Sequence, residues 1–91
     1  MSYNDTMRRK HLKVYNAIFH KPTLANIVWQ DIESLFLSLG AQIIEGSGSR
    51  ISVVLNNQVA VFHRPHPQKE TIKGAVVAVR DFLKLTGVNV C

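Results

Sequence analysis

Residues 50–63 have the sequence RISVVLNNQVAVFH, and this stretch decides the fold. Apolar residues alternate with others on both sides of Asn56-Asn57, which is typical of two strands joined by a tight turn. Asparagine tolerates a positive φ better than most residues, so adjacent asparagines favour a two-residue hairpin turn. The sequence therefore predicts strands over residues 50–55 and 58–63.

A two-residue turn also fixes how the two strands pair. The predicted pairs are Leu55 with Gln58, Val53 with Ala60, Ile51 with Phe62 and Arg50 with His63. One face of the hairpin then carries Ile51, Val53, Leu55, Ala60 and Phe62, and we expect it to face the core. The other face carries Arg50, Ser52, Val54, Val59, Val61 and His63, and we expect it to remain partly open.

The flanking segments complete an α+β chain. The spacing of apolar residues predicts helices over residues 7–19, over Trp29–Leu39 and from about Lys69 to Leu85. It also predicts a strand over Ala41–Glu45, which the loop GSGS at 46–49 follows. Gly40 and Gly87 each follow the last apolar position of a helix, as a C-terminal glycine does. The order α-α-β-β-β-α predicts a three-stranded antiparallel sheet covered on one face by two helices. This is the double-stranded-RNA-binding-domain arrangement with one added helix, although other small α+β folds share the order.

The helices have recognisable core faces. We expect the buried positions to be Leu12, Tyr15, Ile18 and Phe19 in the first helix, Trp29, Ile32, Leu35, Phe36 and Leu39 in the second, and Ile72, Ala75, Val76, Val79, Phe82 and Leu83 in the third. Trp29 is interpreted as a core anchor. The residues Lys73, Arg80 and Lys84 are placed on other helix faces, and His11 and His20 at the surface or at helix ends.

Charge is concentrated near the start of the chain. Residues 1–21 hold five Lys and Arg and one Asp, whereas the whole chain has a net charge of +5. A basic segment on a nearly neutral body is a common way to attract phosphate backbones, and it is equally typical of a solvated helix. We expect one domain over residues 1–91, with 1–27 as a basic N-terminal extension. With Cys91 as the only cysteine and no apolar run of membrane-spanning length, we expect a cytoplasmic protein without a membrane partner.

Several kinds of site are disfavoured by the residues. His63 and His66 have no acidic or cysteine neighbours, so the sequence predicts no metal site. The GSGS loop lacks the following Lys-Ser/Thr of a P-loop and joins two strands instead of a strand and a helix. We therefore expect no nucleotide cofactor, or any other cofactor.

The residues with the strongest chemistry lie around the predicted end of the hairpin. A nuclease without a metal needs a base for the 2′-hydroxyl, an acid for the leaving oxygen and a cation for the phosphate. Histidine can fill either proton role near neutral pH, and arginine can bind a phosphate through two donors. His63 opposite Arg50 would place a base beside a cation. Alternatively, His63 is only a strand-end residue bonded to the segment that follows it.

Four segments resemble the HicA toxins of bacterial toxin–antitoxin pairs. They are LSLGA at 37–41, EGSGSR at 45–50, VAVFHRPHP at 59–67 and FLKLTGV at 82–88. The run that resembles the family extends from Trp29 through Gly87, about two thirds of the chain. The resemblance implies a double-stranded-RNA-binding-like fold, metal-independent cleavage of messenger RNA, and neutralisation by a HicB antitoxin that covers the active site.

One position departs from the family pattern. Ser49 stands where the resemblance places the catalytic histidine, and serine is no acid or base near neutral pH. The candidate catalytic residues are therefore His63, His66 and Ser49, and the candidate RNA-binding residues are Arg50, Arg64, Lys69, Lys73, Gly46, Ser47 and Gly48. Three readings stay open: an endoribonuclease that uses His63 or His66, a module that binds RNA or the antitoxin without cutting RNA, and a protein-interaction domain that uses the open Val54, Val59 and Val61 face.

Overall fold

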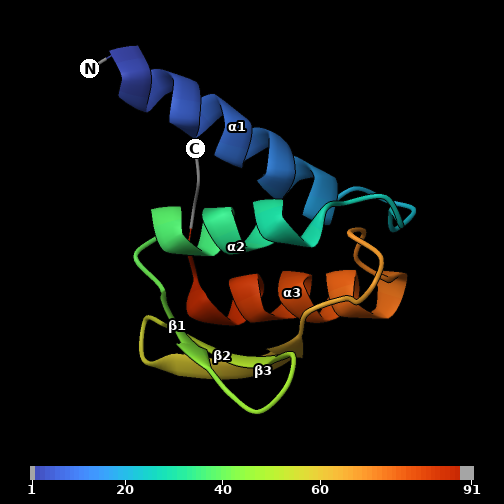
Figure 1. Cartoon of the computed structure of the whole chain (residues 1–91). Helices are drawn as coiled ribbons and strands as arrows, with labels where there is room; N and C mark the ends of the chain where they lie inside the picture. The colour runs from blue at the N-terminus through green and yellow to red at the C-terminus, as the bar shows by residue number, and fades with distance from the viewer. Residues whose placement is uncertain (1, 89–91) are drawn as a thin grey trace.

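The computed structural model describes the backbone of residues 2–88 and the side chains of residues 9–88. Its elements follow the predicted order. They are α1 (Ser2–Ile18), α2 (Trp29–Ser38), β1 (Gln42–Glu45), β2 (Arg50–Leu55), β3 (Gln58–His63) and α3 (Lys73–Thr86). The sequence thus folds as an α+β protein whose helix–three strands–helix order matches a double-stranded-RNA-binding-like fold (Figure 1).

The central hairpin has the predicted turn and register. Asn56 and Asn57 take φ values of 50° and 65°, the positive values that a two-residue turn of this kind requires. The pairs run from Leu55 with Gln58 to Arg50 with His63. Ile51, Val53, Leu55 and Phe62 are buried and Ala60 is half-buried, so the predicted core face is confirmed.

The sheet has the order β1-β2-β3, with both neighbouring pairs antiparallel. The helices α2 and α3 cover one face of this sheet, and α1 lies over the two helices on the side away from the sheet (Figure 1). The molecule therefore has three layers. On the other face of the sheet, Val59, Val61 and His63 are exposed, as is the loop at residues 46–49.

An aromatic cluster forms the centre of the core. Phe62 lies 5.7 Å from Trp29, 5.8 Å from Phe36 and 6.0 Å from Phe82, measured between ring centroids. These four rings come from α2, β3 and α3, and each is at most 6% exposed. Aromatic pairs at this spacing stabilise a small core by more than their buried area alone. The interpretation of Trp29 as a core anchor is confirmed.

The helix α1 belongs to the core, and its buried face differs from the predicted one. From residue 9 on, where its side chains are described, the buried residues are His11, Val14 and Ile18, whereas Leu12, Tyr15 and Phe19 are only partly buried. The expectation that His11 is a surface residue was wrong. The apolar spacing on which that expectation rested could not show that a second helix layer covers the histidine.

Arg80 was also misplaced by the sequence pattern. It is 8% exposed and its Nε donates to the carbonyl oxygen of Ile18 at 2.9 Å. A second guanidinium nitrogen donates to the Thr23 hydroxyl at 3.0 Å. Arg80 on α3 thus satisfies the carbonyl group of Ile18, the last residue of α1, a role that cationic side chains commonly take at helix C-termini. The prediction failed because its partners lie about sixty residues away in the chain.

The last helix begins later than predicted, at Lys73 instead of about Lys69. The preceding residues are used in a short antiparallel bridge with the segment before α2. The Trp29 N–H donates to the carbonyl of Lys69 at 2.9 Å, and the Thr71 N–H donates to the carbonyl of Ile27 at 2.7 Å. Ile72 is therefore the N-cap residue and is exposed, contrary to its predicted core position.

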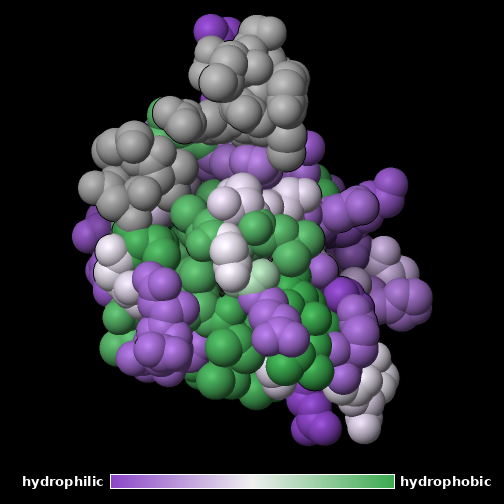
Figure 2. Space-filling model, turned by 90° about the vertical axis from the view of Figure 1, so that its left-hand side faces the viewer, coloured by the Kyte–Doolittle hydropathy of each residue, from purple (hydrophilic) through white to green (hydrophobic). Residues whose placement is uncertain are grey.

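Some apolar residues remain outside the core. Leu37, Ile44, Val59, Val61, Ile72, Val77 and Leu85 are exposed. Apolar residues also form much of the face shown in Figure 2, at the end of the molecule where α2 and α3 finish. Within the described residues, no helix combines the length and the apolar character needed to cross a bilayer.

Candidate functional site at the end of the sheet

The predicted pairing of Arg50 with His63 places two candidate residues side by side at one end of the sheet. Both side chains are exposed. The ladder continues one step further, because the Arg64 N–H donates to the carbonyl of Ser49 at 2.9 Å. The structure therefore brings Ser49, Arg50, His63 and Arg64 together, and Arg50 and His63 belong to the open face of the sheet.

The loop at 46–49 is closed by two backbone hydrogen bonds. The Gly46 N–H donates to the carbonyl of Arg50 at 2.8 Å, and the Arg50 N–H donates to the carbonyl of Ser47 at 3.1 Å. Gly48 has a φ of +61°, which favours glycine. A Cβ atom at Gly46 would lie 3.0 Å from the Arg50 carbonyl oxygen and 3.4 Å from its Nε. Arg50 therefore folds closely over the loop, and the absence of a side chain at Gly46 allows this.

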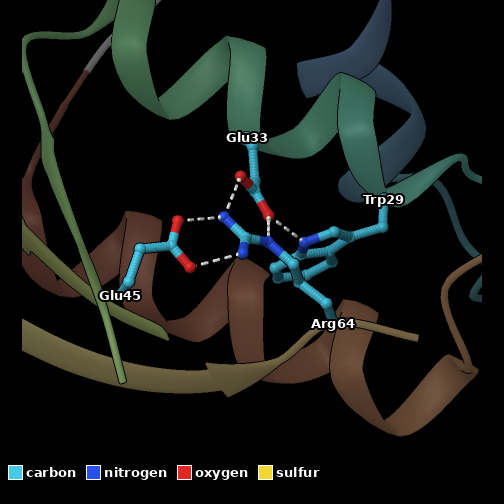
Figure 3. A network of polar contacts seen from close by, with 4 residues as sticks. All are labelled: Trp29, Glu33, Glu45 and Arg64. Carbon is cyan, nitrogen blue, oxygen red and sulfur yellow. Dashed lines mark hydrogen bonds and ion pairs between the residues drawn. The ribbon is translucent and has the colours of Figure 1, made fainter. Parts of the chain in front are cut away.

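Arg64 is held by two carboxylates, as Figure 3 shows. Its Nε donates to Glu33 at 2.7 Å and its Nη2 donates to the same carboxylate at 3.1 Å. Its Nη1 and Nη2 donate to Glu45 at 2.6 Å and 2.8 Å. The indole N–H of Trp29 donates to Glu33 as well. This network, defined here as the Arg64 clamp, joins β1, α2 and the end of β3.

The clamp changes the electrostatics of this end of the sheet. The hydrogen bonds from Arg64 lower the pKa of Glu45 below its ordinary value, and hydrogen bonds to Glu45 and then Glu33 raise the pKa of Arg64 above its ordinary value. One guanidinium and two carboxylates together carry one negative charge. Arg64 donates four hydrogen bonds to these two carboxylates, and their negative charges neutralise its positive charge. A phosphate would therefore gain little binding energy from Arg64.

The remaining candidates lie on the segment between β3 and α3 and at Lys73, the first residue of α3. His66, Lys69 and Lys73 are all exposed. His66 and His63 line the same cleft, and Lys69 lines a neighbouring hollow together with Arg64. These residues are thus near one another, but the structure does not bring His66 into the strand pairing that joins His63 to Arg50.

The basic segment lies elsewhere on the molecule. Arg9, Lys10 and Lys13 are exposed on α1, in the layer farthest from the sheet. Lys10 is 3.8 Å from the carboxylate of Asp31, an exposed ion pair that contributes little stability. The charge of residues 9–21 therefore does not line the cleft of His63 and His66, and the candidate site has its own cations.

The sequence pattern missed Glu33 and Glu45 as partners of Arg64. These residues lie 31 and 19 positions from Arg64, so no local spacing links them to it. The one signal present was the register, because Glu45 pairs with Ile51 and Ile51 pairs with Phe62 at the same end of the sheet.

The sequence model of the family described as HicA toxin of bacterial toxin–antitoxin matches residues 29–88. This range is about two thirds of the chain and contains the sheet, the loop at 46–49 and every candidate residue, so the chain belongs to the HicA toxin family. The match starts at the first residue of α2, and α1 therefore lies outside it. Neither a curated protein nor a solved structure matches the chain.

Proposed function

We propose that this HicA-family chain is an endoribonuclease toxin that cleaves messenger RNA without a metal. The observation that carries the proposal is the pairing of Arg50 with His63 on adjacent strands at an exposed end of the sheet. A base beside a phosphate-binding cation supplies two of the three groups that cleavage through the 2′-hydroxyl requires, and the third is an acid for the leaving oxygen. In the described residues, no three His, Cys, Asp or Glu side chains form a group suited to a metal ion.

In this mechanism His63 takes the proton of the 2′-hydroxyl. The resulting oxygen attacks the adjacent phosphorus, the bond to the 5′-oxygen breaks, and a 2′,3′-cyclic phosphate and a 5′-hydroxyl are formed. Arg50 binds the phosphate and opposes the charge that develops on it. His66 is the candidate for protonating the leaving oxygen. Its loss should lower the rate of cleavage less than the loss of His63 does, because water reaches this exposed cleft and can supply the proton.

The other predicted residues take supporting roles. Lys69 and Lys73 are exposed on either side of Glu70 and can bind neighbouring phosphates along the RNA. Backbone N–H groups of Ser47 and Gly48 are candidates for a further phosphate contact, whereas the N–H of Gly46, also predicted, already donates to the carbonyl of Arg50. Arg64, predicted as a phosphate ligand, is better suited to holding the end of β3 in place through its clamp.

A second candidate function is RNA binding without cleavage. It is favoured by Ser49, which the family resemblance places at the position of the catalytic histidine. The hydroxyl of serine does not transfer protons near neutral pH. The backbone of Ser49 is paired with Arg64, so the loop keeps its place whether or not the residue is catalytic. In this case Arg50, Lys69 and Lys73 would still bind phosphates.

The family also points to an antitoxin partner, and messenger RNA as substrate points to the cytoplasm as the place of action. The exposed side chains of Val59 and Val61 offer an apolar surface next to His63. A HicB-like antitoxin that covered this surface would block the site at the same time.

Induction of the chain alone in bacteria tests the proposal. We expect growth arrest and shortened messenger RNA lifetimes, with 2′,3′-cyclic phosphate ends on the fragments. Normal growth with intact transcripts at good soluble expression would contradict cleavage. RNA binding by the same purified chain would then support the second candidate.

A further inference from the structure

A cleft of about 470 Å³ lies between the edge of β3 and the first half of α3. Residues 61–66 form one wall, and Ile72, Ala75 and Ala78 form the other. The two alanines leave room that longer side chains would fill. The size is within the lower half of the range usual for small-molecule sites, which are mostly apolar with a few polar groups. We call it the β3–α3 cleft.

The backbone of β3 presents free hydrogen-bonding groups at this edge. In an antiparallel hairpin with a two-residue turn, the pairs next to the turn alternate between bonded and non-bonded. The backbone bond from Arg64 to Ser49 shows which pairs are bonded at the far end. Val61 and His63 are consequently in non-bonded pairs, and their N–H and C=O groups point away from β2. In the described part of the chain, neither residue has a backbone partner on that side.

A further polar group is unused in the wall of the cleft. The hydroxyl of Thr71 is buried and has no hydrogen-bond partner among the described residues, and Thr71 lines the cleft. Buried hydroxyl groups are usually paired, so an unpaired one beside a cleft is a feature to explain. The cleft thus combines apolar walls, the rings of His63 and His66, and unused donors and acceptors.

The charge around the cleft and the two prolines that follow β3 favour an RNA base over a polypeptide strand as its occupant. Lys69 and Lys73 flank it beside Gln68 and Ile72, and Glu70 is the one acidic residue among residues 61–80. A strand added to β3 would gain few bonds here, because Pro65 and Pro67, two and four positions after His63, lack N–H groups. A nucleotide needs only one donor–acceptor edge, a stacking surface and a cation for its phosphate.

We propose that the β3–α3 cleft binds one unstacked base of single-stranded RNA, next to the phosphate that Arg50 and His63 engage. This inference rests on the proposed function and specifies its substrate. The base stacks on a histidine ring and bonds to the free backbone groups of β3. The chain therefore acts on single-stranded RNA and discriminates against duplexes, whose bases are not free to enter a cleft.

The test compares two variants on neighbouring positions of α3. Ala78→Phe fills the cleft from an exposed helix position, and Val77→Phe places the same ring on α3 at a residue that does not line the cleft. The probes are a ten-nucleotide RNA, 2′-O-methylated so that it cannot be cleaved, and its counterpart with abasic sugars. Thermal unfolding verifies that both variants are folded.

We expect the wild type to bind the abasic probe more weakly by about 5–150-fold, the equivalent of about 1–3 kcal/mol from base stacking. Ala78→Phe should lose most of this preference, because the variant has a lower affinity only for the base-bearing probe. Val77→Phe should keep the preference. Equal wild-type affinity for both probes, or an Ala78→Phe variant that keeps the preference, would overturn the base site while leaving RNA binding intact. Failure of every probe to bind would overturn the proposed function itself.

Discussion

Arg64, at the end of β3, donates two hydrogen bonds to Glu33 on α2, a residue 31 positions earlier in the chain. The same guanidinium donates two more to Glu45 on β1. One side chain thus fixes the positions of three elements around the candidate site. This relationship explains why the end of the sheet can present Arg50 and His63 in a defined arrangement although both are exposed.

The first prediction concerns this clamp. Arg64→Ala leaves Glu33, whose side chain is 16% exposed, without its cationic partner. Hydrogen bonds to charged groups contribute more than neutral ones, so we expect a loss of about 2 kcal/mol in the free energy of unfolding. Urea denaturation measures it. Arg64→Lys, which keeps the charge but cannot make two paired contacts, should lose less, and an Arg64→Ala variant as stable as the wild type would contradict the clamp.

The second prediction concerns pH. The pKa of Glu45 is lowered in the folded state, mainly by hydrogen bonds from Arg64. As the pH falls below about 5, the unfolded chain therefore binds more protons than the folded chain does. The stability that Glu45 contributes above its unfolded pKa is consequently lost as the pH falls through its folded pKa. In Glu45→Gln this contribution is absent. We expect the variant to show a shallower fall in unfolding free energy than the wild type between about pH 5 and pH 3, measured by denaturation in a pH series. Parallel curves would show that Glu45 is not paired in solution.

The third prediction compares Gly46, where an added side chain would meet the backbone, with Gly74, where it would meet open space. A Cβ at Gly46 would meet the Arg50 carbonyl oxygen at 3.0 Å, whereas a Cβ at Gly74 in α3 would meet no atom within 4 Å. Gly46→Ala should cost about 1–2 kcal/mol and weaken RNA binding, because the loop must shift away from Arg50. Gly74→Ala should stabilise the chain by about 0.5 kcal/mol, since alanine restricts the unfolded state and favours the helix. Thermal unfolding of both variants distinguishes them, and similar effects would contradict the loop geometry.

The fourth prediction concerns salt. If phosphates are bound by the cations of the site, log K for single-stranded RNA should fall linearly with log salt, by about 0.7 per phosphate contact. Arg50→Ala should lower the slope by about one contact. Lys84→Ala removes the same charge from an exposed position in the last turn of α3 and should leave the slope nearly unchanged. Anisotropy titrations at several salt concentrations measure the slopes, and equal slopes for the two variants would show that Arg50 contacts no phosphate.

The sequence predicted the hairpin in detail because its signals are local. Asn56-Asn57 determines the turn, the turn determines the register, and the register places His63 opposite Arg50. The glycines that end two helices were local signals as well, and Gly40 and Gly87 have positive φ values of 91° and 70°. At the hairpin turn and at these two glycines, where a residue and its immediate neighbours determine the backbone, the prediction was confirmed. The first helix, predicted over residues 7–19, spans Ser2–Ile18 instead.

The predictions that failed depend on segments far apart in the chain. A charged or polar residue in an amphipathic pattern is assigned to the surface, so His11 on α1 and Arg80 on α3 were misplaced, although the packing of α1 on the other two helices buries both. The start of α3 was wrong because residues 69–71 bond to the segment before α2. For the candidate site, the sequence predicted the pair of Arg50 and His63 but not the carboxylates that occupy Arg64.

The central claim, that His63 transfers the proton in RNA cleavage, is tested most directly by His63→Gln. The rate of cleavage and the affinity for single-stranded RNA are measured on the same preparations. His63→Gln should lower the rate by about 10²–10⁴-fold with nearly unchanged affinity, because acid–base catalysis contributes to the transition state and little to ground-state binding. His66→Gln should lower the rate less. His20→Gln, at an exposed histidine beyond the end of α1, should have no effect. A His63→Gln variant that cleaves RNA at the wild-type rate would contradict the account.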